Sequence, residues 1–298
     1  WDYHRLYRTD HGPHGKKLED ESPDPAQGIH DPCPHPSHRS IFYEKNSFLS
    51  AFPSGARVRL WTGAPSPKGG EGGGEGEEVR SSSIKVIFFD LGNVILPFNN
   101  YEIAQKLSRF SQKREFQDPK KIFSYLFDLE KGVINDFDMG RVSPSEFFQS
   151  IKKYLGLSIA FEKFIPIWTD IFVENQEVSE IILSLKGRWR LGLLSNTDPL
   201  HFNYIVSTFP IVSALEKWIL SYDVGFKKPD ARIFQRAMEW ASVEPEKILF
   251  IDDTKGHVEA AISLGIQGVH FISATKLREE LFQKQVALSL DGFKKRAF

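Results

Sequence analysis

The chain of 298 residues has a single cysteine and no long apolar run. One cysteine, Cys33, excludes a disulfide bond within the chain and favours a reducing compartment. No stretch approaches the roughly 18 consecutive apolar residues of a transmembrane helix. The first residues also lack the basic segment and apolar core of a signal peptide. We therefore expect a globular, cytoplasmic protein.

The chain also lacks an excess of charge of either sign. Its 38 lysine and arginine residues offset 39 aspartate and glutamate residues, which leaves a net charge of -1 and a pI near 6.8. Such a balance gives no overall attraction to nucleic acid or to an anionic membrane. We expect a small-molecule partner, neither nucleic acid nor membrane, and a monomer or homodimer.

Residues 1–83 show no sustained apolar period and hold most of the histidines and prolines. The run GGEGGGEG at 69–76 is typical of a flexible coil. We expect this segment to be disordered. Because the chain begins with Trp1 and not with methionine, a second hypothesis is that the segment is an over-extension and that the native start lies near Val79.

Short, nearly continuous apolar runs begin at Ile84 and suit parallel strands that are buried on both faces. They are IKVIFFD (84–90), RLGLLS (190–195), WILS (218–221), ILFIDD (248–253) and GVHFI (268–272). Helical patterns occur at 230–241, 256–264 and 275–286. The alternation predicts βαβ units and an α/β fold with a doubly wound, Rossmann-like parallel sheet.

Residues 99–176 interrupt this alternation directly after the first strand. The segment is rich in phenylalanine and lysine, and its apolar residues recur at helical spacing. We expect an inserted α-helical cap at 99–176 and a core domain made of residues 84–98 and 177–298. Ligands of open α/β sheets bind beyond the carboxyl ends of the strands, so an insertion at this point would cover the site.

Polar side chains follow the carboxyl ends of three predicted strands, and a lysine precedes a predicted helix. They are Asp90, Ser195, Asn196, Asp252 and Asp253, with Lys228 as the lysine. Because the carboxyl ends of parallel strands meet at one edge, we expect these side chains to converge. Carboxylates suit Mg²⁺, a hard cation that prefers oxygen ligands. An ammonium and a hydroxyl group would hold a phosphate beside it.

Most of these residues also have a purely structural interpretation. Turn formation would explain Asp90 or Ser195, and helix capping would explain Asp252. However, two adjacent carboxylates after a buried strand repel each other unless a cation lies between them, which favours the functional interpretation. Three other polar residues are expected to be exposed or helix-start residues without a role, namely Lys227, His201 and His257.

The segments VIFFDLGNVI, LLSNTD, KKPDARIF and LFIDD, in this order, resemble the four motifs of the haloacid dehalogenase (HAD) superfamily. The inserted helices resemble its type C1 cap, and the resemblance covers about residues 84–285. The DLGNV form of the first motif, and Leu200-His201 after SNT, are similar to the branch that contains α-D-glucose-1-phosphate phosphatase.

The resemblance implies a role for each matching residue. Asp90 would attack phosphorus and form a phosphoaspartyl intermediate, a covalent route that divides one difficult step into two. Ser195, Asn196 and Lys228 would bind the transferring phosphoryl group, and Lys228 would also orient Asp90.

The resemblance further implies a Mg²⁺ site. Asp90, Asp253 and the Gly92 carbonyl oxygen would bind the ion, with Asp252 acting through a metal-bound water. The cap would close to exclude bulk water and open to release product.

Position 92 departs from the pattern of most phosphatases of this superfamily, which carry a second aspartate there. That aspartate protonates the leaving alcohol, a role worth about 10²–10⁴-fold in rate. Gly92 leaves the proton donor open and favours a good leaving group, such as the anomeric oxygen of a sugar 1-phosphate. In the cap, the segment Asp136–Arg141 is expected to face the core, where Arg141 would either bind substrate oxygens or lie at the surface.

The sequence therefore favours a Mg²⁺-dependent phosphomonoesterase that acts on a small phosphorylated metabolite, sugar phosphates first. A dehalogenase of the same fold is one alternative, because dehalogenases also lack the second aspartate, although the Asp252-Asp253 pair argues against it. A catalytically weak protein that binds a phosphorylated metabolite as a regulator is the other.

Overall fold

The computed structural model describes residues 84–128 and 130–286, so the expectations for residues 1–83 and for the last twelve residues fall outside the described part of the chain. Within this part, parallel strands form a five-stranded sheet in the order β3-β2-β1-β4-β5. The strands are β1 (Val86–Phe89), β2 (Arg190–Ser195), β3 (Lys217–Leu220), β4 (Ile248–Asp252) and β5 (Gln267–His270).

The central strand β1 explains the apolar composition of the runs. Its residues are all buried, and Phe89 lies between Leu193 of β2 and Ile251 of β4 in the register of the sheet. Burial of a side chain of this kind stabilises the fold by about 1.5–3 kcal/mol. The amide of Asp90 then donates to the carbonyl of Ile251 at 2.8 Å, so the first polar residue after β1 is held beside the end of β4.

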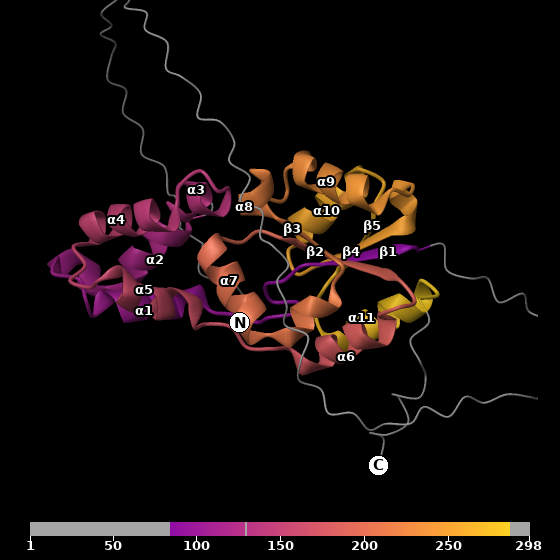
Figure 1. Cartoon of the computed structure of the whole chain (residues 1–298), viewed down its shortest axis with the longest axis horizontal. Helices are drawn as coiled ribbons and strands as arrows, with labels where there is room; N and C mark the ends of the chain where they lie inside the picture. The colour runs from indigo at the N-terminus through magenta and orange to yellow at the C-terminus, as the bar shows by residue number, and fades with distance from the viewer. Residues whose placement is uncertain (1–83, 129, 287–298) are drawn as a thin grey trace, which may run out of the picture. The chain divides into compact units, whose positions relative to one another are not determined.

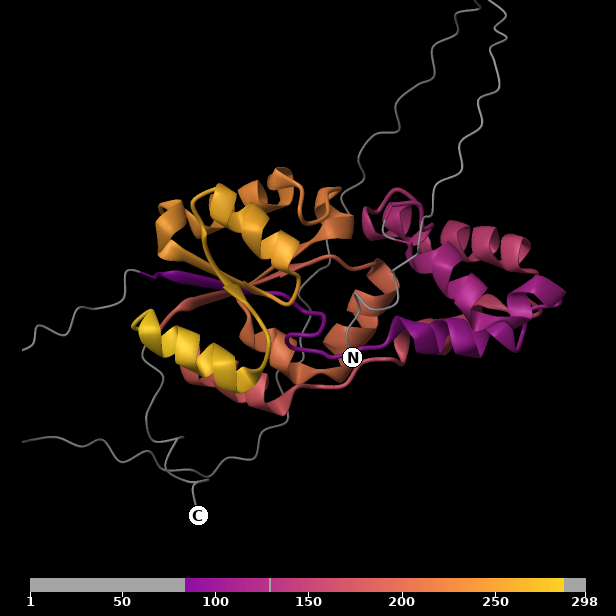
Figure 2. The same cartoon turned by 180° about the vertical axis from the view of Figure 1, so that it is seen from behind.

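Alternate residues of β1 face opposite sides of the sheet, and each side is covered by helices (Figures 1 and 2). Ile87 and Phe89 pack with α6 (Gln176–Leu185), α7 (Pro199–Thr208) and α11 (Ala274–Gln283). Val86 and Phe88 pack with α9 (Ala231–Ala241) and α10 (Lys255–Ser263). Short helices connect these layers, namely η3 (Pro210–Ala214), α8 (Ser221–Val224) and η4 (Pro245–Lys247). This arrangement confirms the predicted doubly wound fold.

Most predicted bounds differ from the structure by one or two residues, and two of the differences have a local reason. Ser221 begins α8 instead of ending a strand, and its hydroxyl bonds with the backbone of Thr197. The helix expected at 275–286 ends at Gln283, because the backbone of Gln285 has a φ of 57° in the left-handed region, which a helix cannot continue.

A helical cap follows β1, as expected. Its elements are α1 (Asn100–Ser108), η2 (Arg114–Gln117), α2 (Pro119–Phe127), α3 (Ile134–Asp138), α4 (Pro144–Leu155) and α5 (Phe161–Thr169). They enclose a hydrophobic cluster of their own, with Phe137, Phe164 and Trp168 fully buried in it. Ser143 and Glu146 form a capping box that starts α4. The cap therefore has a core separate from that of the sheet.

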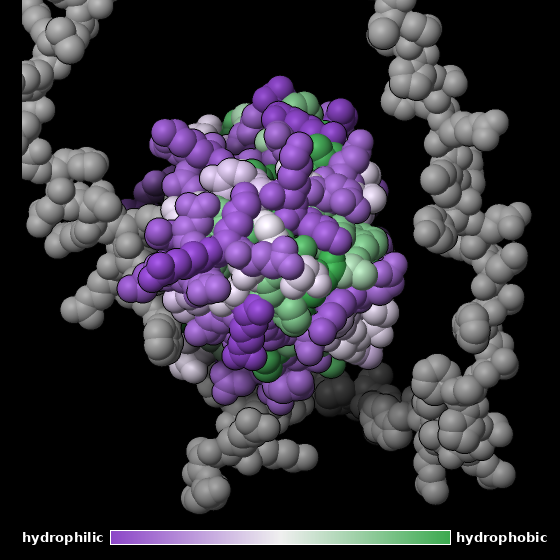
Figure 3. Space-filling view, turned by 90° about the vertical axis from the view of Figure 1, so that its left-hand side faces the viewer, coloured by the Kyte–Doolittle hydropathy of each residue, from purple (hydrophilic) through white to green (hydrophobic). Residues whose placement is uncertain are grey.

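Two adjacent linkers join the cap to the sheet domain. The amide of Val173 donates to the carbonyl of Pro97 at 2.9 Å, and the amide of Asn175 donates to that of Ile95 at 2.9 Å. Seen from the side of the cap, the surface is largely hydrophilic with small apolar patches (Figure 3). Among the described residues, no helix combines the length and apolar character needed to cross a membrane.

Candidate active site

Three carboxylates from the ends of β1 and β4 meet at the carboxyl edge of the sheet. One carboxylate oxygen each of Asp90, Asp252 and Asp253 lies within 4.8 Å of the others. Opposite ligands of a Mg²⁺ ion, at bond lengths of about 2.0–2.1 Å, lie about 4.2 Å apart. The cluster therefore has the donor type and the size that suit one divalent cation. We refer to these three residues as the acidic cluster.

Lys228 supplies the positive charge beside the acidic cluster. Its ammonium nitrogen lies 2.7 Å from Asp90 and 2.6 Å from Asp252, and it donates to the carbonyl of Leu194 at 2.9 Å. The side chain is almost fully buried. Burial alone would lower the pKa of Lys228, but the charges of Asp90 and Asp252 outweigh burial and raise it. Lys228 therefore stays protonated.

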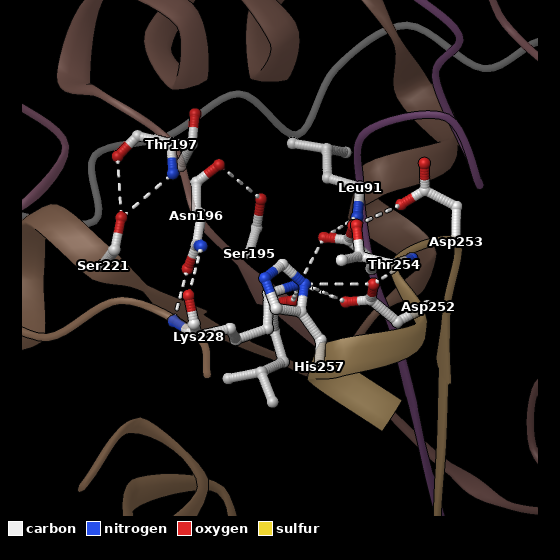
Figure 4. A network of polar contacts seen from close by, with 12 residues as sticks. Leu91, Ser195, Asn196, Thr197, Ser221, Lys228, Asp252, Asp253, Thr254 and His257 are labelled. Atoms are coloured by element: carbon white, nitrogen blue, oxygen red, sulfur yellow. Dashed lines mark hydrogen bonds and ion pairs between the residues drawn. The ribbon is translucent and has the colours of Figure 1, made fainter. Parts of the chain in front are cut away.

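Asp252 is fully buried and already surrounded by donors (Figure 4). Besides Lys228, it accepts a hydrogen bond from the Thr254 amide at 2.8 Å, and Nδ1 of His257 lies 3.1 Å away. Burial would raise the pKa of Asp252, but Lys228 and His257 overcome it and hold the pKa at about 2. His257 lies in the first turn of α10 (Lys255–Ser263), which agrees with the expected helix start, and its ring faces this carboxylate.

A bound cation would offset the negative charge of the other two carboxylates, Asp90 and Asp253. Burial raises the pKa of Asp90 to about 8; Lys228 partly offsets this effect, and the charges of Asp252 and Asp253 add to it. Burial and the charge of Asp252 also raise the pKa of Asp253. Two carboxylates with an unfavourable negative charge suit direct contact with a divalent cation.

A side chain at position 92 would collide with the ring of Phe98 in its present position. A Cβ atom on Gly92 would lie 2.6 Å from Cε1 of Phe98, below any normal contact distance. Phe98 in turn packs against Phe172 of the second linker, with ring centroids 5.6 Å apart. Phe98 thus occupies the space in which a side chain at position 92 would begin, a contact that the sequence alone did not reveal.

The loop after β2 is tied to the loop that carries Lys228. Ser195 is buried at the end of β2. The Asn196 amide group donates to the carbonyl of Lys228 at 3.0 Å, and its oxygen accepts from the amide of Lys228 at 2.7 Å (Figure 4). Both ends of this side chain are used, so in this structure Asn196 fixes the lysine loop instead of reaching outward to a substrate.

The cap segment Asp136–Arg141 contacts the core through residues other than the predicted one. Arg141 pairs with Asp136 at 2.9 Å, and both side chains are more than half exposed. The contact with the core is made by Asp138, whose carboxylate lies 3.6 Å from the ammonium of Lys227, which also donates to Asn135. Lys227 was expected to be a solvated residue, whereas its side chain is only 25% exposed and pairs with the cap.

His201 was expected at the surface or at a helix start, and the structure places it in the first turn of α7, where it is buried. Its Nδ1 lies 2.6 Å from Asp198, and its Nε2 lies 2.8 Å from the carbonyl oxygen of Trp168 in the cap. A sequence signal for this arrangement exists: Asp198 followed by Pro199 is typical of a helix start, which places His201 in the first turn of α7.

Comparisons with known proteins agree with this geometry. Residues 84–265 match the family model of haloacid dehalogenase-like hydrolases. D-ribitol-5-phosphate phosphatase of Bacteroides thetaiotaomicron is 25% identical over 205 residues, which cover 66% of this chain and 97% of that protein. The phosphorylated carbohydrates phosphatase of Thermotoga maritima is 27% identical over 105 residues, which cover 35% of this chain and 49% of that protein.

A solved structure of a HAD-family enzyme from Bacteroides thetaiotaomicron, in complex with magnesium and inorganic phosphate, superposes with a TM-score of 0.55 at 25% identity. The match covers 62% of this chain and 93% of that enzyme. The narrower resemblance to the α-D-glucose-1-phosphate phosphatase branch stays a prediction. With the fold, the cap and a family match over 84–265, this chain belongs to the haloacid dehalogenase-like hydrolases.

Proposed function

We propose that this hydrolase is a Mg²⁺-dependent phosphatase that removes phosphate from a small phosphorylated metabolite. The observation that carries the proposal is the position of Asp90, which lies in the acidic cluster and 2.7 Å from the buried ammonium group of Lys228. A nucleophilic carboxylate beside a fixed positive charge and a cation site is the arrangement that phosphoryl transfer requires.

Two donors meet at the same oxygen of Asp90. The Lys228 ammonium and the amide of Leu91 each lie 2.7 Å from Oδ1, so they fix the carboxylate and favour its charged form. Attack on phosphorus would form the Asp90–phosphate bond and release the alcohol, and water would then hydrolyse this intermediate. Lys228 and the Ser195 hydroxyl group would hold the phosphoryl oxygens.

Asp90, Asp253 and the Gly92 carbonyl oxygen would hold the Mg²⁺ ion. When bound, the ion would offset the negative charge of the phosphoryl group and of the carboxylates. Asp252 is occupied by Lys228 and the Thr254 amide, which supports an indirect role for it.

The substrate class is supported by two separate observations. The relatives that match this chain are named for ribitol 5-phosphate and for phosphorylated carbohydrates, which favours a phosphorylated sugar or polyol. The lack of an acid at Gly92 favours a leaving group that needs little protonation, such as the anomeric oxygen of a sugar 1-phosphate. Rates of hydrolysis of ribitol 5-phosphate, glucose 1-phosphate and glucose 6-phosphate would distinguish these two substrate arguments. A preference for glucose 6-phosphate over glucose 1-phosphate would contradict the leaving-group argument.

The decisive experiment measures hydrolysis of 4-nitrophenyl phosphate with Mg²⁺, with excess chelator, and in the Asp90→Asn variant. We expect turnover that requires Mg²⁺ and disappears in Asp90→Asn. Glu239→Gln, which changes an exposed surface pair on α9, is the matched control and should retain the activity. Halide release from a haloacid in the presence of chelator would favour the dehalogenase alternative. Tight binding of a phosphorylated metabolite without turnover would favour the regulatory one.

A further inference from the structure

A second group of buried polar side chains joins α7 of the core to α5 of the cap. Asp198 is fully buried at the start of α7, and His201 lies in the first turn of the same helix. Trp168, on α5, is also fully buried. Its indole N–H donates to Asp198 at 3.1 Å, and its backbone carbonyl lies 2.8 Å from Nε2 of His201.

The partners of His201 determine how many protons its ring carries. A backbone carbonyl can only accept, so Nε2 of His201 must donate to Trp168. At 2.6 Å, one proton lies between Nδ1 and the carboxylate of Asp198. That carboxylate also accepts from the Trp168 indole and from the amides of Leu200 and His201, and this set of donors favours its charged form. These hydrogen-bond partners therefore favour a doubly protonated ring for His201.

The surroundings of His201 support this charge state. Its ring stacks on the indole of Trp168 at 5.3 Å between centroids. Burial alone would lower the pKa of His201, but the ion pair with Asp198 and the bond to Trp168 outweigh it and raise the pKa. The other charged groups that act here are Asp138 of α3, which also raises the pKa of His201, and Lys227, which lies 3.6 Å from Asp138.

This junction lies next to the loops of the active site. Asp198 comes three residues after Ser195, and Lys227 directly precedes Lys228. The cap thus touches the core beside both phosphate-binding residues, once through His201 and once through Lys227. A change in either contact would move a loop that positions a proposed active-site residue.

We propose that His201 is a positioning residue that works as an imidazolium ion: it fastens the cap to the core beside the Ser195 loop, and loss of its proton loosens this attachment and lowers turnover. A neutral ring has one N–H, so it can donate either to Asp198 or to Trp168 but not to both. The part that concerns turnover rests on the proposed phosphatase function, whereas the protonation state and the attachment do not.

The first test uses no substrate. In the full chain, the ¹⁵N shifts of the His201 ring, identified by their absence in His201→Gln, should show two protonated nitrogens at pH 7 and a titration above the ordinary pKa of about 6.5. Exchange of the Trp168 indole N–H, corrected for its intrinsic pH dependence, should accelerate through the same titration. A ring with a single proton at pH 6, or unchanged indole protection, would overturn the proposal even if the protein is no phosphatase.

The second test uses turnover. The kcat of the wild-type protein should fall as pH rises through the titration of His201, whereas the kcat of His201→Gln should be lower, on the order of tenfold at pH 7, and should lack this transition. Ser207→Ala is the control on the same helix, because it removes an exposed hydrogen bond within α7, from the Ser207 hydroxyl to the carbonyl of Tyr204 at 2.8 Å, and should change kcat by less than about twofold. A folded His201→Gln variant that keeps the wild-type pH profile would exclude the positioning role.

Discussion

The ring of Phe98 occupies the place where a side chain on Gly92 would begin, since a Cβ there would lie 2.6 Å from its Cε1. Phe98 belongs to the first linker to the cap, and its contact with Phe172 ties this linker to the second one. The residue that replaces the second aspartate and the aromatic pair between the linkers are therefore parts of one packing arrangement. An aspartate at position 92 would therefore require the ring of Phe98 to move.

We predict that Gly92→Ala lowers the free energy of unfolding by about 1–3 kcal/mol, because the added methyl group overpacks against Phe98. In a Phe98→Leu background the same substitution should lower the free energy of unfolding by less, because the aromatic ring that it would contact is absent. Urea unfolding of the wild-type protein, both single variants and the double variant measures this coupling. An equal cost of Gly92→Ala in both backgrounds would show that Phe98 is not the obstacle.

Lys228 offsets two buried carboxylates, and its replacement should be costly. We predict that Lys228→Met lowers the free energy of unfolding by about 3–5 kcal/mol, because Asp90 and Asp252 would lose the buried positive charge that offsets their own. Denaturant unfolding in the presence of chelator measures this cost without help from a cation. Lys276→Met, at an exposed pair on α11, is the control and should change stability by at most about 0.5 kcal/mol. Similar costs for both variants would contradict the prediction.

The acidic cluster could be predicted from the sequence because the strands of a parallel sheet all end at the same edge. Strands β1 and β4 are neighbours in register, so residues that directly follow them must lie side by side. Asp90 and Asp253 needed no knowledge of side-chain packing to be placed at one edge. The same logic placed Ser195 at the end of β2.

The contacts between cap and core could not be predicted in this way. Lys227 and Asp138 are far apart in the sequence, and their pairing depends on how the cap packs against the core. The five-residue helix α3 is too short for an apolar period to show which side faces the core. Gly140 approaches the core so closely that a Cβ would lie 2.2 Å from the carbonyl oxygen of Tyr222, and this contact too depends on the packing of the cap.

Asp138 should make the stability of the protein depend on pH. Burial raises its pKa to about 7, although Lys227 opposes this effect. The ordinary pKa of aspartate is about 3.9, so between that value and about 7 the folded state binds more protons than the unfolded state, and the contribution of Asp138 to stability falls as pH rises. We predict that the free energy of unfolding of the wild-type protein decreases from pH 4 to pH 7 relative to that of Asp138→Asn. The same dependence of the free energy of unfolding on pH in the two proteins would contradict this prediction.

Asn196 was expected to bind substrate, and Arg141 either to bind substrate or to lie at the surface; the structure gives them different positions. The guanidinium group of Arg141 is exposed and pairs only with the exposed Asp136 among the contacts found for it, so Arg141→Ala should change stability by at most about 1 kcal/mol and kcat/KM by less than about twofold. The Asn196 amide holds the backbone of Lys228 at 2.7 and 3.0 Å, and Asn196→Ala should lower kcat about tenfold or more because the lysine would lose its fixed position. Steady-state kinetics with 4-nitrophenyl phosphate and with a sugar phosphate would separate kcat from KM for both variants. A large increase in KM of Arg141→Ala with the sugar phosphate alone would show that the cap loop turns toward the site when the natural substrate binds.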